Sequence, residues 1–223
     1  IHRAVVAEQA NKRQPYGPSP TAGIRHSVST WGKGRGVARV QRLSQGSKAA
    51  ESPNNVGGRR AFPPKPEKDY SKKVNRKERQ KARLSALAAM ADEEIVRQRG
   101  HLFEEGVTTP VIIEDAFESL TTTAEVYEVL DKIGVSADLG RAKDGRKVRA
   151  GRGKMRSRRY KGKRSVLLVV SAQEVSLFKG AGNLPGVEVV SIDGLNTGRL
   201  APGGMPGRLA VFSESALKKI GEW

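Results

Sequence analysis

The excess positive charge of this chain is confined to two segments that lack the residues for a hydrophobic core. Residues 1–75 contain 15 Lys and Arg against 4 Asp and Glu, and residues 141–164 contain 13 against 1. Of the remaining segments, 76–140 has a net negative charge and 165–223 has none. The whole chain carries a formal charge of +18. Like charges at this density repel one another unless a polyanion neutralises them. The pattern therefore predicts nucleic acid as the partner.

The two less basic segments contain the pattern of an α/β domain. Apolar strands are expected at 110–114, 165–171, 186–192 and 208–212, and helices at 122–133, 173–179 and 213–220. Strands that are apolar throughout and alternate with helices are typical of a parallel sheet buried on both sides. We therefore expect a parallel sheet flanked by helices on both faces.

Two helices are expected outside this alternation. The first spans residues 1–13 and is stopped by Pro15 and Gly17. The second runs from Lys72 to about Arg99, with Ser71 as its N-cap. Its spacing predicts an apolar face made of Leu84, Leu87, Ala88, Ala91 and Ile95.

The stretch between these helices is rich in Pro and Gly and has no sustained hydrophobic period. Its length is far beyond that of ordinary connections, and such loops are either functional or disordered. We predict a first helix of the globular body at 1–14, a long extended basic internal loop at 15–70, and the rest of the body at 71–223, with the basic segment 141–164 within it.

The sequence offers little for catalysis or for a cofactor. The chain has no Cys, and its glycine-rich stretches at 140–147 and 180–185 fail the phosphate-loop and dinucleotide patterns. His2, His26 and His101 have no metal-ligand spacing, so they are interpreted as surface or structural histidines. We expect no cofactor, no metal and no enzyme; the alternative is a nucleic-acid-modifying enzyme that uses Glu114 and Asp115. No apolar stretch approaches the ~18 residues of a membrane span, and a soluble cytoplasmic protein without a membrane partner is expected.

The composition of the basic segments favours the binding of RNA over a role in charge neutralisation alone. They mix Arg, small residues and aromatics, and Arg both grips phosphate in bidentate fashion and stacks on bases. Three alternatives stay open: an RNA chaperone, a compactor of duplex DNA, and a solvated tail or localisation signal.

Four motifs in order along the chain resemble the archaeal and eukaryotic branch of the L four family of large-subunit ribosomal proteins. They are WGKGRGVARV from Trp31, GGRRAFPPKPEK from Gly57, NRKER from Asn75 leading into SALAA, and RAGRGKMRSRRY from Arg149. The resemblance implies binding to large-subunit ribosomal RNA, neighbouring ribosomal proteins as partners, a role in subunit assembly and translation, and a loop that lines the tunnel of the nascent peptide. Family members usually carry an N-terminal β segment before the first helix, so a strand preceding Ile1 is expected to complete the body.

On this interpretation the loop tip lies between Leu43 and Phe62, and its tunnel-facing residues are Gly46, Ser47, Gly57, Gly58 and Arg59. The candidates for contact with RNA are the basic and aromatic residues of the motifs and of the helix start: Arg25, Trp31, Lys33, Arg35, Arg39, Arg42, Arg59, Arg60, Lys65, Lys72, Lys73, Arg76, Arg79, Arg149, Arg152, Lys154, Arg156, Arg158, Arg159, Tyr160, Lys161, Lys163 and Arg164.

Overall fold

A parallel four-stranded sheet forms the centre of the computed structural model, which describes residues 1–221. The strand order is β3 (Val111–Ile113), β8 (Ala210–Ser213), β6 (Leu167–Val170) and β7 (Glu188–Ser191). In the register, Val169 of β6 lies opposite Val190 of β7 and Phe212 of β8. All four strands were predicted from the sequence, and the parallel α/β class is confirmed.

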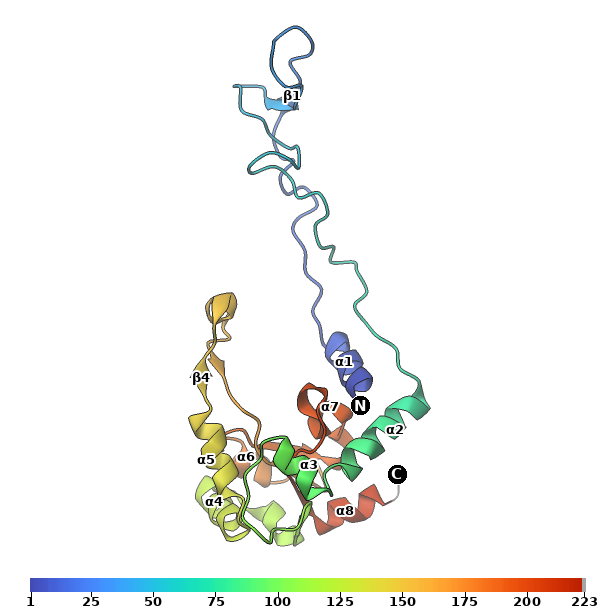
Figure 1. Cartoon of the computed structure of the whole chain (residues 1–223), viewed down its shortest axis with the longest axis vertical. Helices are drawn as coiled ribbons and strands as arrows, with labels where there is room; N and C mark the ends of the chain where they lie inside the picture. The colour runs from blue at the N-terminus through green and yellow to red at the C-terminus, as the bar shows by residue number, and fades with distance from the viewer. Residues whose placement is uncertain (222–223) are drawn as a thin grey trace. The chain divides into compact units, whose positions relative to one another are not determined.

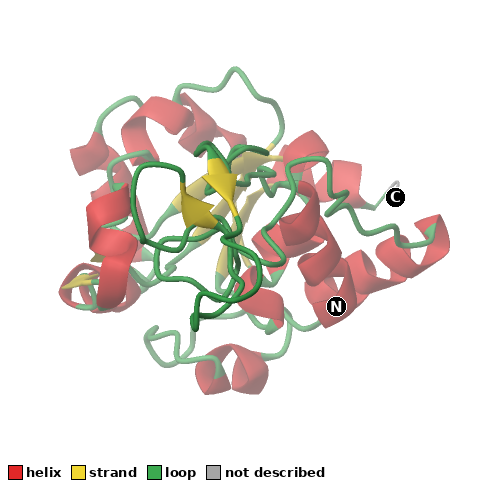
Figure 2. Cartoon of the chain, turned by 90° about the horizontal axis from the view of Figure 1, so that it is seen from above, coloured by secondary structure: helices red, strands yellow, loops and turns green. Residues whose placement is uncertain are grey.

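Helices pack on both faces of this sheet, whose strands are among those drawn in yellow in Figure 2. Alternate residues of β6 point to opposite sides: Leu168 and Val170 belong to one apolar cluster, while Leu167 and Val169 belong to the other. The first cluster includes residues of α4 (Thr123–Lys132), α5 (Ser136–Asp144) and α6 (Leu177–Ala181). The second includes residues of α1 (His2–Asn11), α2 (Arg76–Ala88), α7 (Thr197–Leu200) and α8 (Glu214–Ile220).

Side-chain caps fix the start of two predicted helices. The Thr122 hydroxyl accepts a hydrogen bond from the Glu125 amide at the start of α4, and the Ser213 hydroxyl accepts one from the Ala216 amide at the start of α8. Such a bond satisfies one of the amides that has no partner within the helix. Both starts, and the first helix of the chain, agree with the prediction.

The prediction of a single long helix over residues 72–99 is wrong. The structure has α2 and then α3 (Glu93–Gln98), and the Asp92 side chain accepts hydrogen bonds from the Glu94 and Ile95 amides. This cap starts a new helix and interrupts the old one. Asn75, not Ser71, precedes α2, and its side chain makes no capping bond.

The packed face of α2 also differs from the prediction. Ala82 and Ala86 of α2 and Met90 just beyond its end are buried. Of the predicted residues, Leu87 is partly buried against the same cluster, whereas Leu84 is 47% exposed. The buried residues are spaced by four, as one face of a helix requires. Small alanines let α2 approach its neighbours closely, so side-chain size is a poor guide to the buried face here.

Three further differences concern the segments that follow. The helix expected at 173–179 lies later, as α6, and α5 and α7 were not predicted. The basic segment contains a hairpin of β4 (Lys147–Val148) and β5 (Tyr160–Lys161), paired antiparallel. Short 3-10 helices complete the structure: η1 (Asp115–Ser119), η2 (Gly151–Arg156), η3 (Ile192–Gly194) and η4 (Pro202–Gly204).

The chain divides into two compact units. The body consists of Ile1–Ala10 and the described residues from Lys72 onward, and the arm consists of Asn11–Ser71. Within the arm, β1 (Val28–Ser29) pairs antiparallel with β2 (Arg42–Leu43), and turns and extended chain make up most of the rest (Figure 1).

Glycines let the two sides of the arm touch. A Cβ added to Gly17 would lie 2.3 Å from the Pro64 carbonyl oxygen. One added to Gly23 would lie 2.6 Å from the Arg59 Cα, and Gly23 also has a φ of +81°. Since any larger residue would separate the two sides of the arm at these points, glycine is required for their close approach.

Candidate nucleic-acid interface

Most of the basic side chains of the arm are exposed to solvent. Most of the arm residues predicted to contact RNA are exposed: Arg25, Lys33, Arg35, Arg39, Arg59, Arg60 and Lys65. An exposed Lys or Arg gains little from surface ion pairs. In the described part of the arm, these cations therefore contribute charge to its surface and little to its folding.

Trp31 and Arg42 are partly buried and organise one region of the arm. The Arg42 guanidinium lies 4.8 Å from the Trp31 ring centroid and that of Arg35 lies 5.4 Å from it. Arg42 also donates hydrogen bonds to the Ser47 and Ala38 carbonyls, at 2.6 and 3.3 Å. Its guanidinium is therefore used within the arm, and the more exposed Arg35 is the better placed of the two to meet a ligand.

A second cationic stack lies where the arm begins and ends. The Arg13 guanidinium is 4.4 Å from the Tyr70 ring centroid, and the Lys68 ammonium is 5.7 Å from it. This contact joins the first and last residues of the arm. Arg13, Lys68 and Tyr70 were not among the predicted contacts; their charge and aromatic character were the only signals in the sequence.

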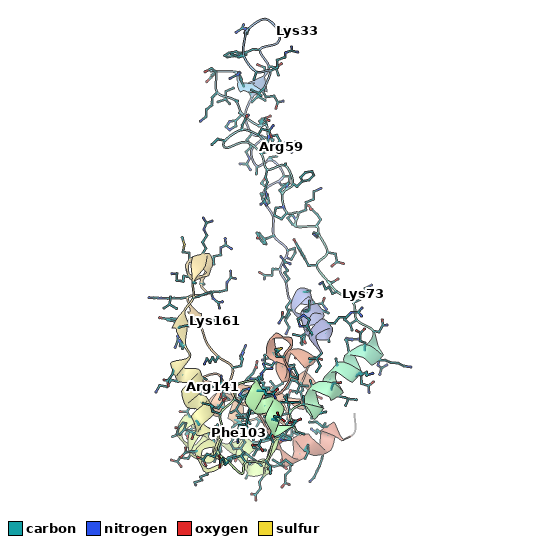
Figure 3. The ribbon with its side chains drawn as sticks, viewed as in Figure 1. Lys33, Arg59, Lys73, Phe103, Arg141 and Lys161 are labelled. Carbon is teal, nitrogen blue, oxygen red and sulfur yellow. The ribbon has the colours of Figure 1, made fainter. Side chains whose placement is uncertain are left out.

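The turn around Lys33 lies at one end of the arm, and Arg59 lies nearer its middle (Figure 3). Gly32, Gly34 and Gly36 in this turn all have positive φ, a conformation that favours glycine. Gly46 and Ser47 lie in a bend after β2, Gly57 lies in a turn, and Gly58 and Arg59 follow this turn in irregular chain. No local pattern in the sequence predicts where these segments lie in space, because the pairing of β1 with β2 joins residues far apart in the chain.

The hairpin presents the second group of predicted contacts. Arg149 holds it together, since its Nε donates to the Arg158 carbonyl at 3.1 Å and its Nη2 to the Tyr160 carbonyl at 3.4 Å. The other predicted residues of this segment are exposed: Arg152, Lys154, Arg156, Arg158, Arg159, Tyr160, Lys161, Lys163 and Arg164. The hairpin projects beyond α5 in the body (Figure 1). One arginine thus supports a hairpin that carries the others at its surface.

Tyr160 lies between two arginines. The guanidinium of Arg146 is 4.3 Å from its ring centroid and that of Arg159 is 5.5 Å from it. Arg146 was not predicted as a contact, although it belongs to the same basic segment. Both arginines are exposed, so a base or a phosphate can reach them.

The start of α2 contributes a third exposed group. Lys72, Lys73, Arg76 and Arg79 are exposed, and the side chains of Arg76, Arg79 and Arg83 line one hollow of the body. Arg3 of α1 forms an ion pair with Glu78 of α2 at 3.1 Å. Glu78 is therefore paired with a residue of α1, while Lys72, Lys73, Arg76 and Arg79 remain exposed.

Several large apolar side chains are exposed beside the cations. Val56 is 99% exposed, Phe62 92% and Met155 85%. Exposed apolar groups at a protein surface often mark contacts with a partner. These three were not predicted, because a single apolar residue between polar neighbours has no periodic signal.

Asp115 and His101, two of the residues considered for chemistry, make contacts within the body. Residues 1–221 contain no group of three or more His, Cys, Asp or Glu that could hold a metal. Asp115 accepts hydrogen bonds from the hydroxyl and the amide of Ser215, which hold the pKa of its carboxyl below the usual value. His101 is buried and hydrogen-bonded to Asp138, as a structural histidine would be. No described helix combines the length and apolarity needed to cross a membrane.

Comparison with known proteins gives one consistent result. The sequence matches the model of the Ribosomal protein L4/L1 family over residues 1–223. It is 51% identical over 223 residues to "Large ribosomal subunit protein uL4" of Archaeoglobus fulgidus, covering 100% of this chain and 87% of that protein. The corresponding proteins of Methanoculleus marisnigri and Methanocaldococcus jannaschii are both 49% identical, over 100% of this chain and 88% and 87% of theirs.

Proposed function

The chain belongs to the ribosomal protein L4/L1 family, and from this premise we propose that it binds large-subunit ribosomal RNA through its arm, its hairpin and the start of α2. The family resemblance inferred from the sequence is confirmed. The chain is a structural, non-enzymatic protein of the large ribosomal subunit and serves translation. The alternative of a nucleic-acid-modifying enzyme is therefore set aside.

The observation that carries the proposal is the exposure of cations on segments without a hydrophobic core. The two buried apolar clusters contain no residue of the arm or of the described segment 146–164. Segments of this kind order when a polyanion neutralises them, because phosphate contacts offset the loss of conformational entropy. Ribosomal RNA provides such a polyanion along the whole length of the arm.

We further propose that the arm lines the tunnel through which the nascent peptide leaves, and that the protein supports subunit assembly. The small residues Gly46, Ser47, Gly57 and Gly58 suit a crowded passage, and Arg59 beside them can face either RNA or the peptide. Neighbouring ribosomal proteins complete the set of partners. The family resemblance supports these roles, and the exposed turns of the arm are compatible with them.

RNA binding can be tested with the purified chain and large-subunit ribosomal RNA in a filter-binding assay over a range of salt concentrations. Replacing Arg152, Arg156 and Arg158 by Gln removes three exposed charges from the hairpin. We expect the slope of log affinity against log salt to fall by about 2 to 3, since each phosphate contact contributes about 0.7 to 0.9.

The matched control replaces three exposed lysines of the body by Gln, namely Lys132, Lys179 and Lys218. It removes the same charge and should leave the slope nearly unchanged. Equal losses in both variants would mean that net charge alone drives binding, and the hairpin interface would be refuted. Equal affinity for duplex DNA of the same length would instead favour the DNA compactor.

A further inference from the structure

Five arginines from distant parts of the chain meet where the sheet strands begin. Arg141 of α5 donates to the Arg164 carbonyl at 2.8 Å, and Arg208 donates to the next carbonyl, that of Ser165, at 3.3 Å. Arg208 also donates to the Arg199 carbonyl at 2.8 Å. Arg99 adds hydrogen bonds to the nearby carbonyls of Pro202, Met205 and Pro206.

A single carboxylate is shared by three of these arginines. Glu188, the first residue of β7, contacts Arg208 at 2.8 Å, Arg164 at 3.7 Å and also Arg199. We call these four residues the Glu188 cluster. One carboxylate neutralises one guanidinium, so two positive charges of the cluster remain uncompensated. The other carboxylate of this region, Asp138, is paired with Arg141.

Arg208 shows that the cluster is short of acceptors. Its side chain is fully buried, and its Nη2 has no hydrogen-bond partner among the described residues. Nη2 belongs to the same guanidinium as Nη1, which contacts Glu188, so the unpaired donor lies within the cluster. A buried donor without a partner carries a substantial free-energy cost. Burial, followed by the neighbouring charges of Arg164 and Arg199, lowers the pKa of Arg208 to about 9.

The other two arginines of the cluster are open to solvent. The Arg164 side chain is 59% exposed and that of Arg199 is 42% exposed. In the sequence, Arg164 directly follows the exposed residues Lys161 and Lys163 at the base of the hairpin. An anion that approaches along the hairpin therefore reaches Arg164 and then Arg199 without any rearrangement of the core.

We propose that the Glu188 cluster is a binding site for a backbone phosphate of RNA, gripped by Arg164 and Arg199. The proposal rests on the RNA-binding function proposed above and extends it from the arm, the hairpin and the start of α2 to the edge of the sheet. Arginine suits this task because its planar guanidinium holds phosphate oxygens in bidentate fashion. The phosphate supplies the negative charge that the cluster lacks, and Arg199, which sequence reasoning missed, becomes an RNA contact.

The test compares Arg199→Gln with Arg97→Gln. Arg97 is a matched control, because its side chain is also 42% exposed and also pairs with a glutamate, Glu93. The Arg199 substitution keeps the backbone carbonyl that Arg208 uses, so the fold is expected to persist. With large-subunit ribosomal RNA as the probe, we expect Arg199→Gln to reduce the salt slope by about 1 and the affinity about 3- to 10-fold, and Arg97→Gln to leave both unchanged.

For a second variant, Glu188→Gln, we expect RNA affinity and the salt slope to change in the opposite direction. Removing the carboxylate leaves more uncompensated arginine charge, so the RNA affinity and the salt slope should both rise at low salt. A purely structural cluster would instead lose thermal stability in both the Arg199 and Glu188 variants, with no gain in binding. Melting curves by circular dichroism, recorded on the same samples, separate these results.

The outcomes separate the two proposals. If the unsubstituted chain does not bind ribosomal RNA, the proposed function fails. If it binds and the hairpin variant loses affinity while Arg199→Gln binds as tightly as Arg97→Gln, RNA binding stands and the phosphate site at the Glu188 cluster is overturned.

Discussion

At the scale of the residue, Asp138 holds together three parts of the body. It is fully buried, and its carboxylate accepts hydrogen bonds from the Ser165 hydroxyl at 2.6 Å and from Arg141 at 2.7 Å. It also bonds to the His101 ring at 3.1 Å and accepts from the Leu102 amide. Burial by itself would raise the pKa of Asp138, but its hydrogen bonds with His101, Arg141 and Ser165 outweigh burial and hold the pKa well below the usual value.

This arrangement predicts how stability depends on acid. Because the folded pKa of Asp138 is depressed, its stabilisation is fully present above the ordinary value of 3.8 and is lost as the pH falls below it. Asp138→Asn breaks a buried ion pair, and we expect a loss of about 3 to 5 kcal/mol at neutral pH. The free energy of unfolding of this variant should also decline less in acid than that of the unsubstituted chain. Urea unfolding at a series of pH values measures this difference.

Asp131→Asn is the control, since Asp131 lies exposed on α4. It should change the free energy of unfolding by no more than about 0.5 kcal/mol. A similar acid profile for Asp138→Asn and the unsubstituted chain would contradict the assigned role of the carboxylate.

At the scale of the element, α2 shows that residue size does not identify the packed face. Ala86 is fully buried and belongs to the same apolar cluster as Val5 of α1 and Phe212 of β8. The helix therefore lies close to the sheet, and a larger side chain has no space there.

We accordingly expect Ala86→Leu to destabilise the body by about 1 to 3 kcal/mol through overpacking. Leu84→Ala should cost less than about 1 kcal/mol, because Leu84 is 47% exposed. Both variants can be compared by chemical denaturation monitored by circular dichroism. A larger cost for Leu84→Ala would support the face predicted from the sequence and contradict the structure of α2.

At the scale of the whole molecule, the arm and the body have separate tasks. The body contains both apolar clusters, whereas the arm is held by turns, a two-residue strand pair and cation–π contacts. Removing residues 43–60 should therefore leave the melting temperature of the body within about 2 °C, since almost no apolar area is lost from its core. Circular dichroism melting measures this directly.

The same deletion should lower affinity for ribosomal RNA, because it removes the exposed residues Lys48, Arg59 and Arg60. A body that fails to fold without residues 43–60 would refute the separation of roles. Subunits that carry the deleted chain are expected to differ from normal subunits at the exit tunnel, which chemical probing of the RNA there would reveal.

Local patterns in the sequence were sufficient for the sheet strands, the helix starts at Thr122 and Ser213, and the charge of the arm and the hairpin. These features depend on residues close together in the chain, so their physical cause can be seen there. The four ordered motifs were sufficient for the family. The interruption at Asp92 has a local signal, since a cap residue is followed by Glu93 and Glu94, but the apolar spacing continues across it.

Which residues from distant segments meet depends on how the strands and helices of the body pack together. The Asp138 network joins residues from 101 to 165, and the Glu188 cluster joins residues from 164 to 208. The buried face of α2 depends in the same way on what lies opposite its alanines. The class of fold and the basic character of the arm and the hairpin follow from hydrophobic period and charge, which are local properties, and the family follows from the four ordered motifs. The convergence of arginines on one glutamate depends on strand order and helix packing, and no local pattern contains that information.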